Sequence, residues 1–175
     1  MEQKPASLMK SSLTSGVYLG IVLILVSVVI YVTGNSFASW VQYISYPILI
    51  AGAAWAQISY KKALGGEMTY GQALGVGVMT IIFASVLSGI YTYLLYAVID
   101  PSMQEQALLY AEQKLVEQGK LSEAQIDAAV NLQAKLMKPP IMAAMAIFGG
   151  AFIGLIISLI TAIFTKKNPT DEVPE

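Results

Sequence analysis

The sequence predicts an all-α, polytopic membrane protein with four transmembrane helices and an extramembrane helical hairpin between helices 3 and 4. One observation is composition: 56% of the 175 residues are hydrophobic and 12% are charged, whereas soluble domains average about 25% charged residues. The other is that apolar residues gather in long runs without acids or lysines, and a helix needs about 20 such residues to cross a bilayer. We expect a single membrane domain over residues 1–175.

The first span is expected over residues 13–33 and the second over residues 40–60. Aliphatic residues fill the centre of the first span, between Ile21 and Ile30, and each contributes about −0.3 to −0.6 kcal/mol to insertion. Lys10 precedes this run, so a cleaved signal peptide is the alternative interpretation. The run is longer than the roughly 7–15 apolar residues of a signal segment, which favours an uncleaved span.

The third span is expected over residues 70–99 and the fourth over residues 141–165. Thr69 and Gln72 have the spacing of a capping box at the start of the third. A helix of about 30 residues would be about 45 Å long, which exceeds the roughly 30 Å hydrocarbon core. The third helix is therefore expected to tilt, bend or protrude.

An extracytoplasmic helical insert is expected over residues 101–139, with Asp100 as the N-cap before it. Apolar residues recur at helical spacing on both sides of Gly119, which predicts two helices. Their apolar faces either pack on each other as a hairpin beside the membrane or dock a partner protein or a second copy of the chain. Residues 166–175 are expected to form a short disordered tail.

The distribution of lysines predicts the orientation. Lys4 and Lys10 precede the first span, residues 61–62 follow the second, and residues 166–167 follow the fourth. The positive-inside rule then places both termini and the loop after the second span in the cytoplasm. The helical insert faces the outside.

Several classes of function are disfavoured by residues that the sequence lacks. It has no cysteine and no histidine, which removes the commonest metal ligands and proton carriers. We therefore expect no catalytic residue, no cofactor-binding residue, no metal site and no enzyme. A net charge of −1 argues against nucleic-acid binding. Gln57 and Gln72 either line a solute entry or hydrogen-bond to neighbouring helices.

Glycines at GxxxG spacing mark candidate positions for helix packing, because small residues let two helix backbones approach closely in lipid. The motif does not distinguish packing within one chain from homo-oligomerisation. The candidates are Gly16, Gly20, Gly71, Gly75, Gly77, Gly150 and Gly154.

The order of features after the second span resembles a known family. Residues 68–77 read MTYGQALGVG, and a long span with a tyrosine-rich end, Ile99-Asp100-Pro101, an acidic helical insert and a last span follow. The pattern resembles a bacterial membrane-protein family, found mainly in Bacteroidetes and catalogued as domain of unknown function 4199. The likeness extends from the first span to the fourth. It implies a bacterial inner-membrane location and four spans, and it carries over no functional residues.

Together these features predict an integral inner-membrane protein with a non-enzymatic, structural or accessory role, acting through helix packing and its outer hairpin. The expected partners are the lipid bilayer and either a second copy of the chain or another membrane protein. The alternative is a subunit of a small oligomeric transporter or channel, which should show a continuous polar cavity.

Overall fold

The computed structural model describes residues 7–167, except for the side chain of Gln42. Within these residues no strand forms, apart from a single antiparallel bridge between Met68 and Lys167. The predicted all-α class is confirmed. The helices are, in chain order, α1 (Leu8–Val32), α2 (Val41–Ala63), α3 (Tyr70–Leu94), the π-helix η1 (Leu95–Ile99), α4 (Ser102–Gln118), α5 (Glu123–Leu136) and α6 (Pro139–Thr165).

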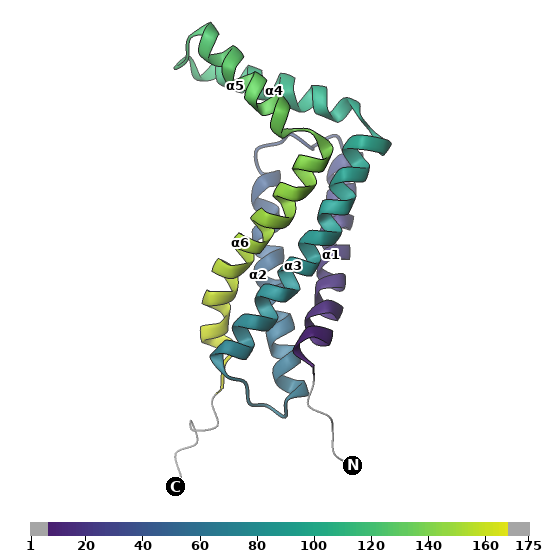
Figure 1. Ribbon diagram of the computed structural model, residues 1–175, viewed down its shortest axis with the longest axis vertical. Helices are drawn as coiled ribbons and strands as arrows, with labels where there is room; N and C mark the ends of the chain where they lie inside the picture. Colours follow the sequence, from purple (N-terminus) through teal and green to yellow (C-terminus); the bar gives the residue numbers. More distant parts are fainter. Residues whose placement is uncertain (1–6, 168–175) are drawn as a thin grey trace.

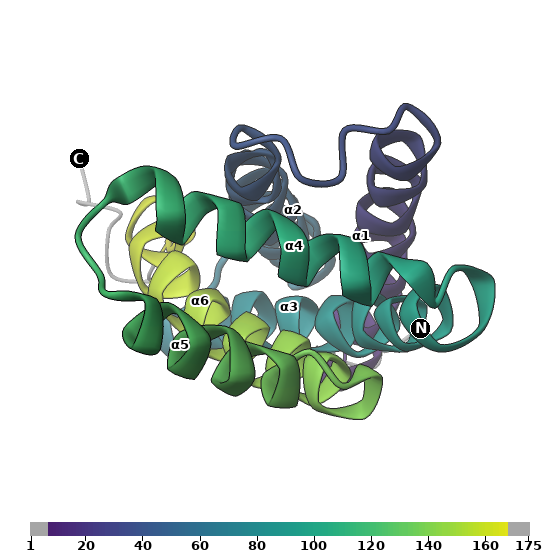
Figure 2. The same ribbon diagram turned by 90° about the horizontal axis from the view of Figure 1, so that it is seen from above.

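Helices α1, α2, α3 and α6 run alongside one another as a bundle, and α4 and α5 lie across one end of it (Figures 1 and 2). Helix α3 packs against each of the other three bundle helices. Its residues Ala73, Val76, Ile81 and Ala84 are fully buried. The core of the bundle therefore follows one side of α3.

Three of the described helical segments are long and apolar enough to cross a membrane: α1, α3 continued by η1 (Tyr70–Ile99), and α6. These segments indicate a membrane protein. Helix α2 has 23 residues but is less apolar than the other three, because it contains Pro47, Gln57, Lys61 and Lys62. The count of four spans therefore stays a prediction.

The two ends of the third apolar segment have distinct structures. At its start, the Thr69 hydroxyl accepts a hydrogen bond from the Gln72 backbone N–H at 3.3 Å, and Gln72 Oε1 accepts one from the Thr69 N–H at 2.9 Å. The predicted capping box is present. At its end, the α-helix widens at Leu95 into the π-helix, and the Asp100 N–H donates to the Leu95 carbonyl oxygen at 2.8 Å.

The expected disordered tail over residues 166–175 falls, from residue 168 onward, outside the described residues. The Met68 and Lys167 backbones exchange two hydrogen bonds of 2.9 Å each. These bonds hold the end of α6 against the loop that precedes α3.

Candidate functional site

We call α4, α5 and the turn between them (residues 102–136) the α4–α5 unit. The turn begins at Gly119, whose φ of +62° lies in the left-handed region that glycine adopts without strain. Helix α5 then starts after Ser122, whose backbone N–H donates to Gln125 Oε1 at 2.9 Å. The two helices therefore meet at the glycine that the sequence marked as a break between two helical segments.

The first turns of α4 are fixed to the bundle through Asp100. Its carboxylate accepts hydrogen bonds from the Tyr31 hydroxyl of α1 at 3.0 Å and from the Ser102 backbone N–H at 3.1 Å. The Ser102 hydroxyl also donates to it. Met103 and Ala107, one turn apart on α4, are both buried. Helix α4 is thus attached through one polar contact and one apolar face.

The same hydrogen bonds set the charge state of Asp100. The bond from the Ser102 hydroxyl is the main reason that the pKa of Asp100 lies below its ordinary value of 3.8, and the Tyr31 hydroxyl also lowers it. Partial desolvation acts in the opposite direction. The carboxylate is therefore ionised at neutral pH, as suits its place next to the positive end of a helix. The N-cap itself is Pro101 and not Asp100.

Two further contacts hold α4 to the bundle, one from its middle and one from its first turn. The ring of Phe37, in the loop between α1 and α2, stacks on the ring of Tyr110 with centroids 5.6 Å apart. Gln104 Nε2 donates to the Tyr96 carbonyl oxygen of η1 at 3.1 Å. Helix α4 therefore bridges the α1–α2 loop and the end of the third apolar segment.

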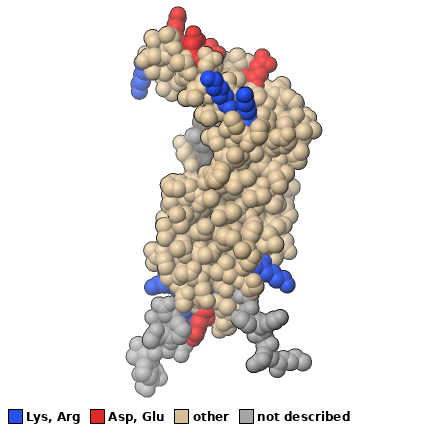
Figure 3. All heavy atoms as spheres, in the orientation of Figure 1, with Lys and Arg blue, Asp and Glu red and all other residues tan. Residues whose placement is uncertain are grey.

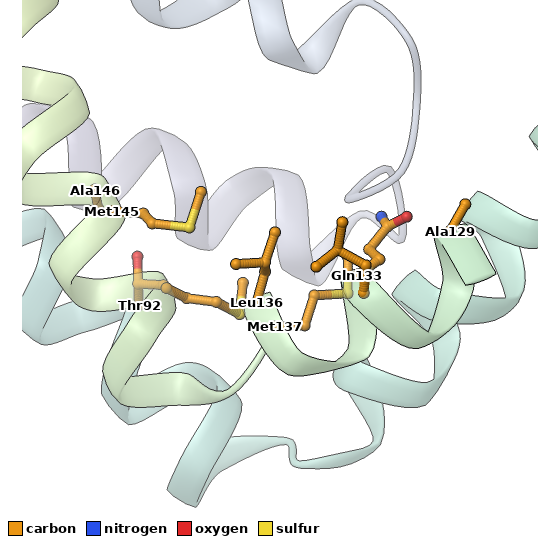
Figure 4. A pocket seen from close by; sticks show the side chains of 9 residues that line it. Thr92, Ala129, Gln133, Leu136, Met137, Met145 and Ala146 are labelled. Atoms are coloured by element: carbon orange, nitrogen blue, oxygen red, sulfur yellow. The ribbon is translucent and has the colours of Figure 1, made fainter.

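Helix α5 is much less buried than α4. None of its 14 residues is buried, and it packs against α4. Leu132 is 60% exposed and Leu136 is 43% exposed. A groove of about 730 Å³ lies between α5 and the first turns of α6 (Figure 4). Its apolar walls include Leu132, Leu136, Met137, Met142 and Met145.

A polar cluster lies inside the bundle near its other end. Gln57 of α2 is 0% exposed. Its Nε2 donates to the Ala73 carbonyl oxygen of α3 at 3.1 Å, and its Oε1 accepts from the Thr165 hydroxyl of α6 at 3.0 Å. Lys61 Nζ donates to the Thr165 carbonyl oxygen at 3.0 Å. Gln57 therefore links three helices, whereas Gln72 belongs to the cap of α3, so both side chains bond to protein groups.

The candidate glycines of α1 face α3. A Cβ added at Gly16 would lie 2.5 Å from Phe83 Cβ and 2.8 Å from the Thr80 carbonyl oxygen. At Gly20 it would lie 3.0 Å from Leu87 Cβ. The absence of side chains at these two positions lets the helices approach closely.

Three candidate glycines lie where α6 packs on α3. A Cβ at Gly154 would lie 2.8 Å from Ile81 Cγ2, and one at Gly150 would overlap Ser85. A Cβ at Gly77, on α3, would lie 2.5 Å from the Ser158 Oγ of α6. Contact between α3 and α6 therefore depends on small residues from both helices.

The remaining two candidates differ from these. A Cβ at Gly75 would meet Leu8 Cδ1 at 3.3 Å, which is a tight contact with a movable side-chain end. A Cβ at Gly71 would meet nothing within 4 Å. The expectation of close packing at Gly71 is not met within the described residues, because this position in the first turn of α3 faces away from the other helices.

The contacts that attach α4, namely Tyr31 with Asp100 and Phe37 with Tyr110, were not predicted from the sequence. A partial signal exists, since Tyr31 lies near the end of the first predicted span and Asp100 follows the third, so topology alone places both at one end of the bundle. No pattern in the sequence indicates the groove beside α5, because the groove depends on the angle between α5 and α6. Among residues 7–167, no group of three or more metal-ligating side chains comes together.

No match is found among curated proteins or among solved structures. A family model matches residues 14–167, which include most of α1 and all of the later helices. The chain therefore belongs to the family described as "Protein of unknown function (DUF4199)".

Proposed function

We propose that this protein crosses the bacterial inner membrane four times, through α1, α2, α3 and α6, and that it has a non-enzymatic, structural or accessory role. The four bundle segments contain long stretches without charge, over residues 11–60, 68–99 and 139–165. Figure 3 shows the corresponding face of the bundle, which carries charged groups at its two ends and none between them. A surface of this kind suits the hydrocarbon core of a bilayer.

The packing of α2 supports it as the fourth span. Its 23 residues extend about 35 Å at about 1.5 Å per residue, enough for a core of about 30 Å. Gln57, which lowers the apolar character of α2, is buried and bonded to α3 and α6, so lipid does not meet it. Ile50, Trp55 and Ile58 are exposed on the same helix. The face of α2 that would contact lipid is therefore more apolar than the average over all its residues.

The arrangement of the chain supports the proposed orientation. The start of α1, the end of α6 and the loop between α2 and α3 lie at the same end of the bundle, opposite the α4–α5 unit (Figure 1). Lys10, residues 61–62 and residues 166–167 belong to that end. By the positive-inside rule this end is cytoplasmic and the α4–α5 unit lies outside.

The observation that carries the proposed accessory role is that the α4–α5 unit has only two buried residues, Met103 and Ala107, so that most of its surface stays exposed. Val116 and Leu109 of α4 are also exposed. They are seven residues apart and so lie on one face of α4, and a contiguous exposed apolar patch is typical of a contact surface for another molecule. The transporter alternative is disfavoured for a single copy, because Ala73, Val76 and Ile81 close the centre of the bundle.

Single cysteines test the accessory role, since the natural sequence has none. Val116→Cys and Leu109→Cys should each crosslink to the same second protein in native membranes. Phe164→Cys is the matched control, because Phe164 is exposed at the opposite end of the bundle. The proposal is rejected if neither α4 position captures a protein, or if the control captures the same one.

Labelling with a membrane-impermeant maleimide tests the topology. In cells with a permeable outer membrane, Lys120→Cys in the turn of the α4–α5 unit should react before the inner membrane is opened. Lys62→Cys at the end of α2 should react only afterwards. Labelling of Lys62→Cys before the inner membrane is opened would contradict the proposed orientation. Equal labelling of the two variants would contradict the four-span topology.

A further inference from the structure

We infer that the groove between α5 and α6 binds an acyl chain of an anionic glycerophospholipid, with the lipid phosphate next to Lys135 and Lys138. The inference rests on the proposed insertion into a membrane and deepens it by naming a molecular partner. The occupant follows from three features: the shape and chemistry of the groove, its depth in the bilayer, and the charges beside it.

The groove has the size and lining of a site for a long apolar group. Its volume of about 730 Å³ falls within the roughly 300–1,000 Å³ of small-molecule sites. Leu136 and Met137 line it from the α5 side and Met145 lines it from α6 (Figure 4). Methionine side chains adapt to irregular apolar partners, which suits a flexible hydrocarbon chain.

Helix α5 has more apolar surface than α4 covers. At about 100° per residue, Ile126 and Val130 lie on one side of its apolar face, whereas Leu132 and Leu136 lie on the neighbouring side. The first two are half-buried, and the second two are exposed and line the groove. The groove therefore remains open after α4 and α5 have packed together.

The depth of the groove favours lipid over a water-soluble partner. Met142, Met145 and Ala146 line it from the first turns of α6, and the charge-free stretch of α6 begins at Pro139. If α6 spans the membrane, these residues lie where the outer hydrocarbon boundary begins. The molecules present at that depth are lipid chains, whereas a soluble peptide would have to leave water to reach it.

The charges beside the groove suit an anionic headgroup. Lys135 and Lys138 are exposed, and neither forms an ion pair with any described residue. No acid occurs between Asp127 and Lys167. Figure 3 shows lysine groups at the edge of the α4–α5 unit that faces the bundle, and acidic groups on its outer side. Lysines at this depth can lay their stems on apolar surface and present the ammonium group to phosphate.

The positive-inside rule does not account for these two lysines, because they lie on the outer side in the proposed orientation. A phosphate at the outer surface of the bilayer does account for them. The amide of Gln133, which also borders the groove, adds a hydrogen-bonding group for the polar part of the same lipid.

The test uses the purified full-length protein in phosphatidylcholine vesicles that contain phosphatidylglycerol with a photoreactive diazirine on its acyl chain. Mass spectrometry of the crosslinked peptides should place the probe on Leu136, Met142 and Met145. Leu136→Trp should fill the groove and abolish these crosslinks. Leu121→Trp, the same change at an exposed site in the turn of the α4–α5 unit, should leave them unchanged. Crosslinks that survive Leu136→Trp, or that spread evenly over exposed bundle residues such as Phe152, would overturn the inference.

The headgroup is tested separately with Lys135→Gln and Lys138→Gln. Each change should reduce crosslinking to phosphatidylglycerol about fivefold, and both together up to about 30-fold, because each lysine near an anionic lipid contributes about 1 kcal/mol, which is about fivefold in binding. In the same variants, crosslinking to phosphatidylcholine that carries the same photoreactive chain should fall only slightly. Lys120→Gln, in the turn of the α4–α5 unit, is the control. An equal loss for both lipids, or no loss, would reject the anionic headgroup.

Alkaline carbonate extraction of the same membranes separates this inference from the proposed function. If the wild-type protein and its variants stay in the membrane pellet but the lipid probe does not crosslink in the groove, the lipid site is rejected and membrane insertion is not. If the wild-type protein is extracted by carbonate, membrane insertion fails and the lipid site fails with it. Capture of a protein segment in the groove, in place of lipid, would also overturn the inference.

Discussion

Replacing Gly16 with alanine should force α1 away from α3 and destabilise the bundle. The new Cβ would lie 2.5 Å from Phe83 Cβ and 2.8 Å from the Thr80 carbonyl oxygen. Neither atom is the end of a flexible side chain, so one helix has to move. Overpacking of this kind costs about 1–3 kcal/mol, and the better helix propensity of alanine offsets about 1 kcal/mol. We expect the free energy of unfolding to fall by up to about 2 kcal/mol.

Gly71→Ala is the matched control, because it makes the same change in a bundle helix where the added Cβ meets nothing within 4 Å. Its free energy of unfolding should stay the same or rise by up to about 1 kcal/mol. Both variants can be unfolded in mixed micelles of increasing dodecyl sulfate content and followed by circular dichroism. If Gly16→Ala proves as stable as Gly71→Ala, the close approach of α1 and α3 is refuted.

Two more predictions concern the polar contacts. Gln57→Leu keeps a side chain of similar size and removes two hydrogen bonds. Because such bonds contribute about 0.6 kcal/mol each in membranes, the free energy of unfolding should fall by about 1 kcal/mol. A fall of more than about 3 kcal/mol in the same micelle assay would contradict a purely local role for Gln57. The pKa of Asp100 lies below 3.8, so the contribution of its carboxylate to stability is complete at neutral pH and is lost as the pH falls from 3.8 through the lowered value. Ser102→Ala should raise the pKa of Asp100 back toward 3.8, so that the loss of stability begins at a higher pH. Carbon NMR titration of the carboxyl group measures this pKa. An unchanged pKa would show that the Ser102 hydroxyl is not the main cause of the lowered value.

Much of the helical content could be predicted because its signals are local. Thr69 and Gln72 form the expected capping box, and Gly119 ends α4 in the left-handed conformation. Asp100 was predicted as the N-cap of α4; Pro101 occupies that position, and Asp100, one residue earlier, accepts from the Ser102 N–H. In the first two cases, residues within a few positions of one another determine the backbone, so their spacing in the sequence is sufficient.

The candidate site could be predicted only in outline. The composition of residues 101–139 indicated two amphipathic helices, but it did not show that α4 would be tied to the bundle while α5 kept its apolar residues exposed. That difference comes from Tyr31 and Phe37, which lie more than sixty positions away from the residues they contact. The polarity of Gln57 likewise gave no sign of its burial among three helices.

By itself, the sequence determined the helical class and the apolar segments suited to a membrane. These follow from sums over about 20 neighbouring residues, because transfer into lipid depends on each segment's own composition. Only the tertiary structure decided which small residues make contacts and where the groove lies. Gly16 and Gly71 begin the same GxxxG spacing, yet one meets α3 and the other meets open space, because packing depends on the direction in which each helix face points.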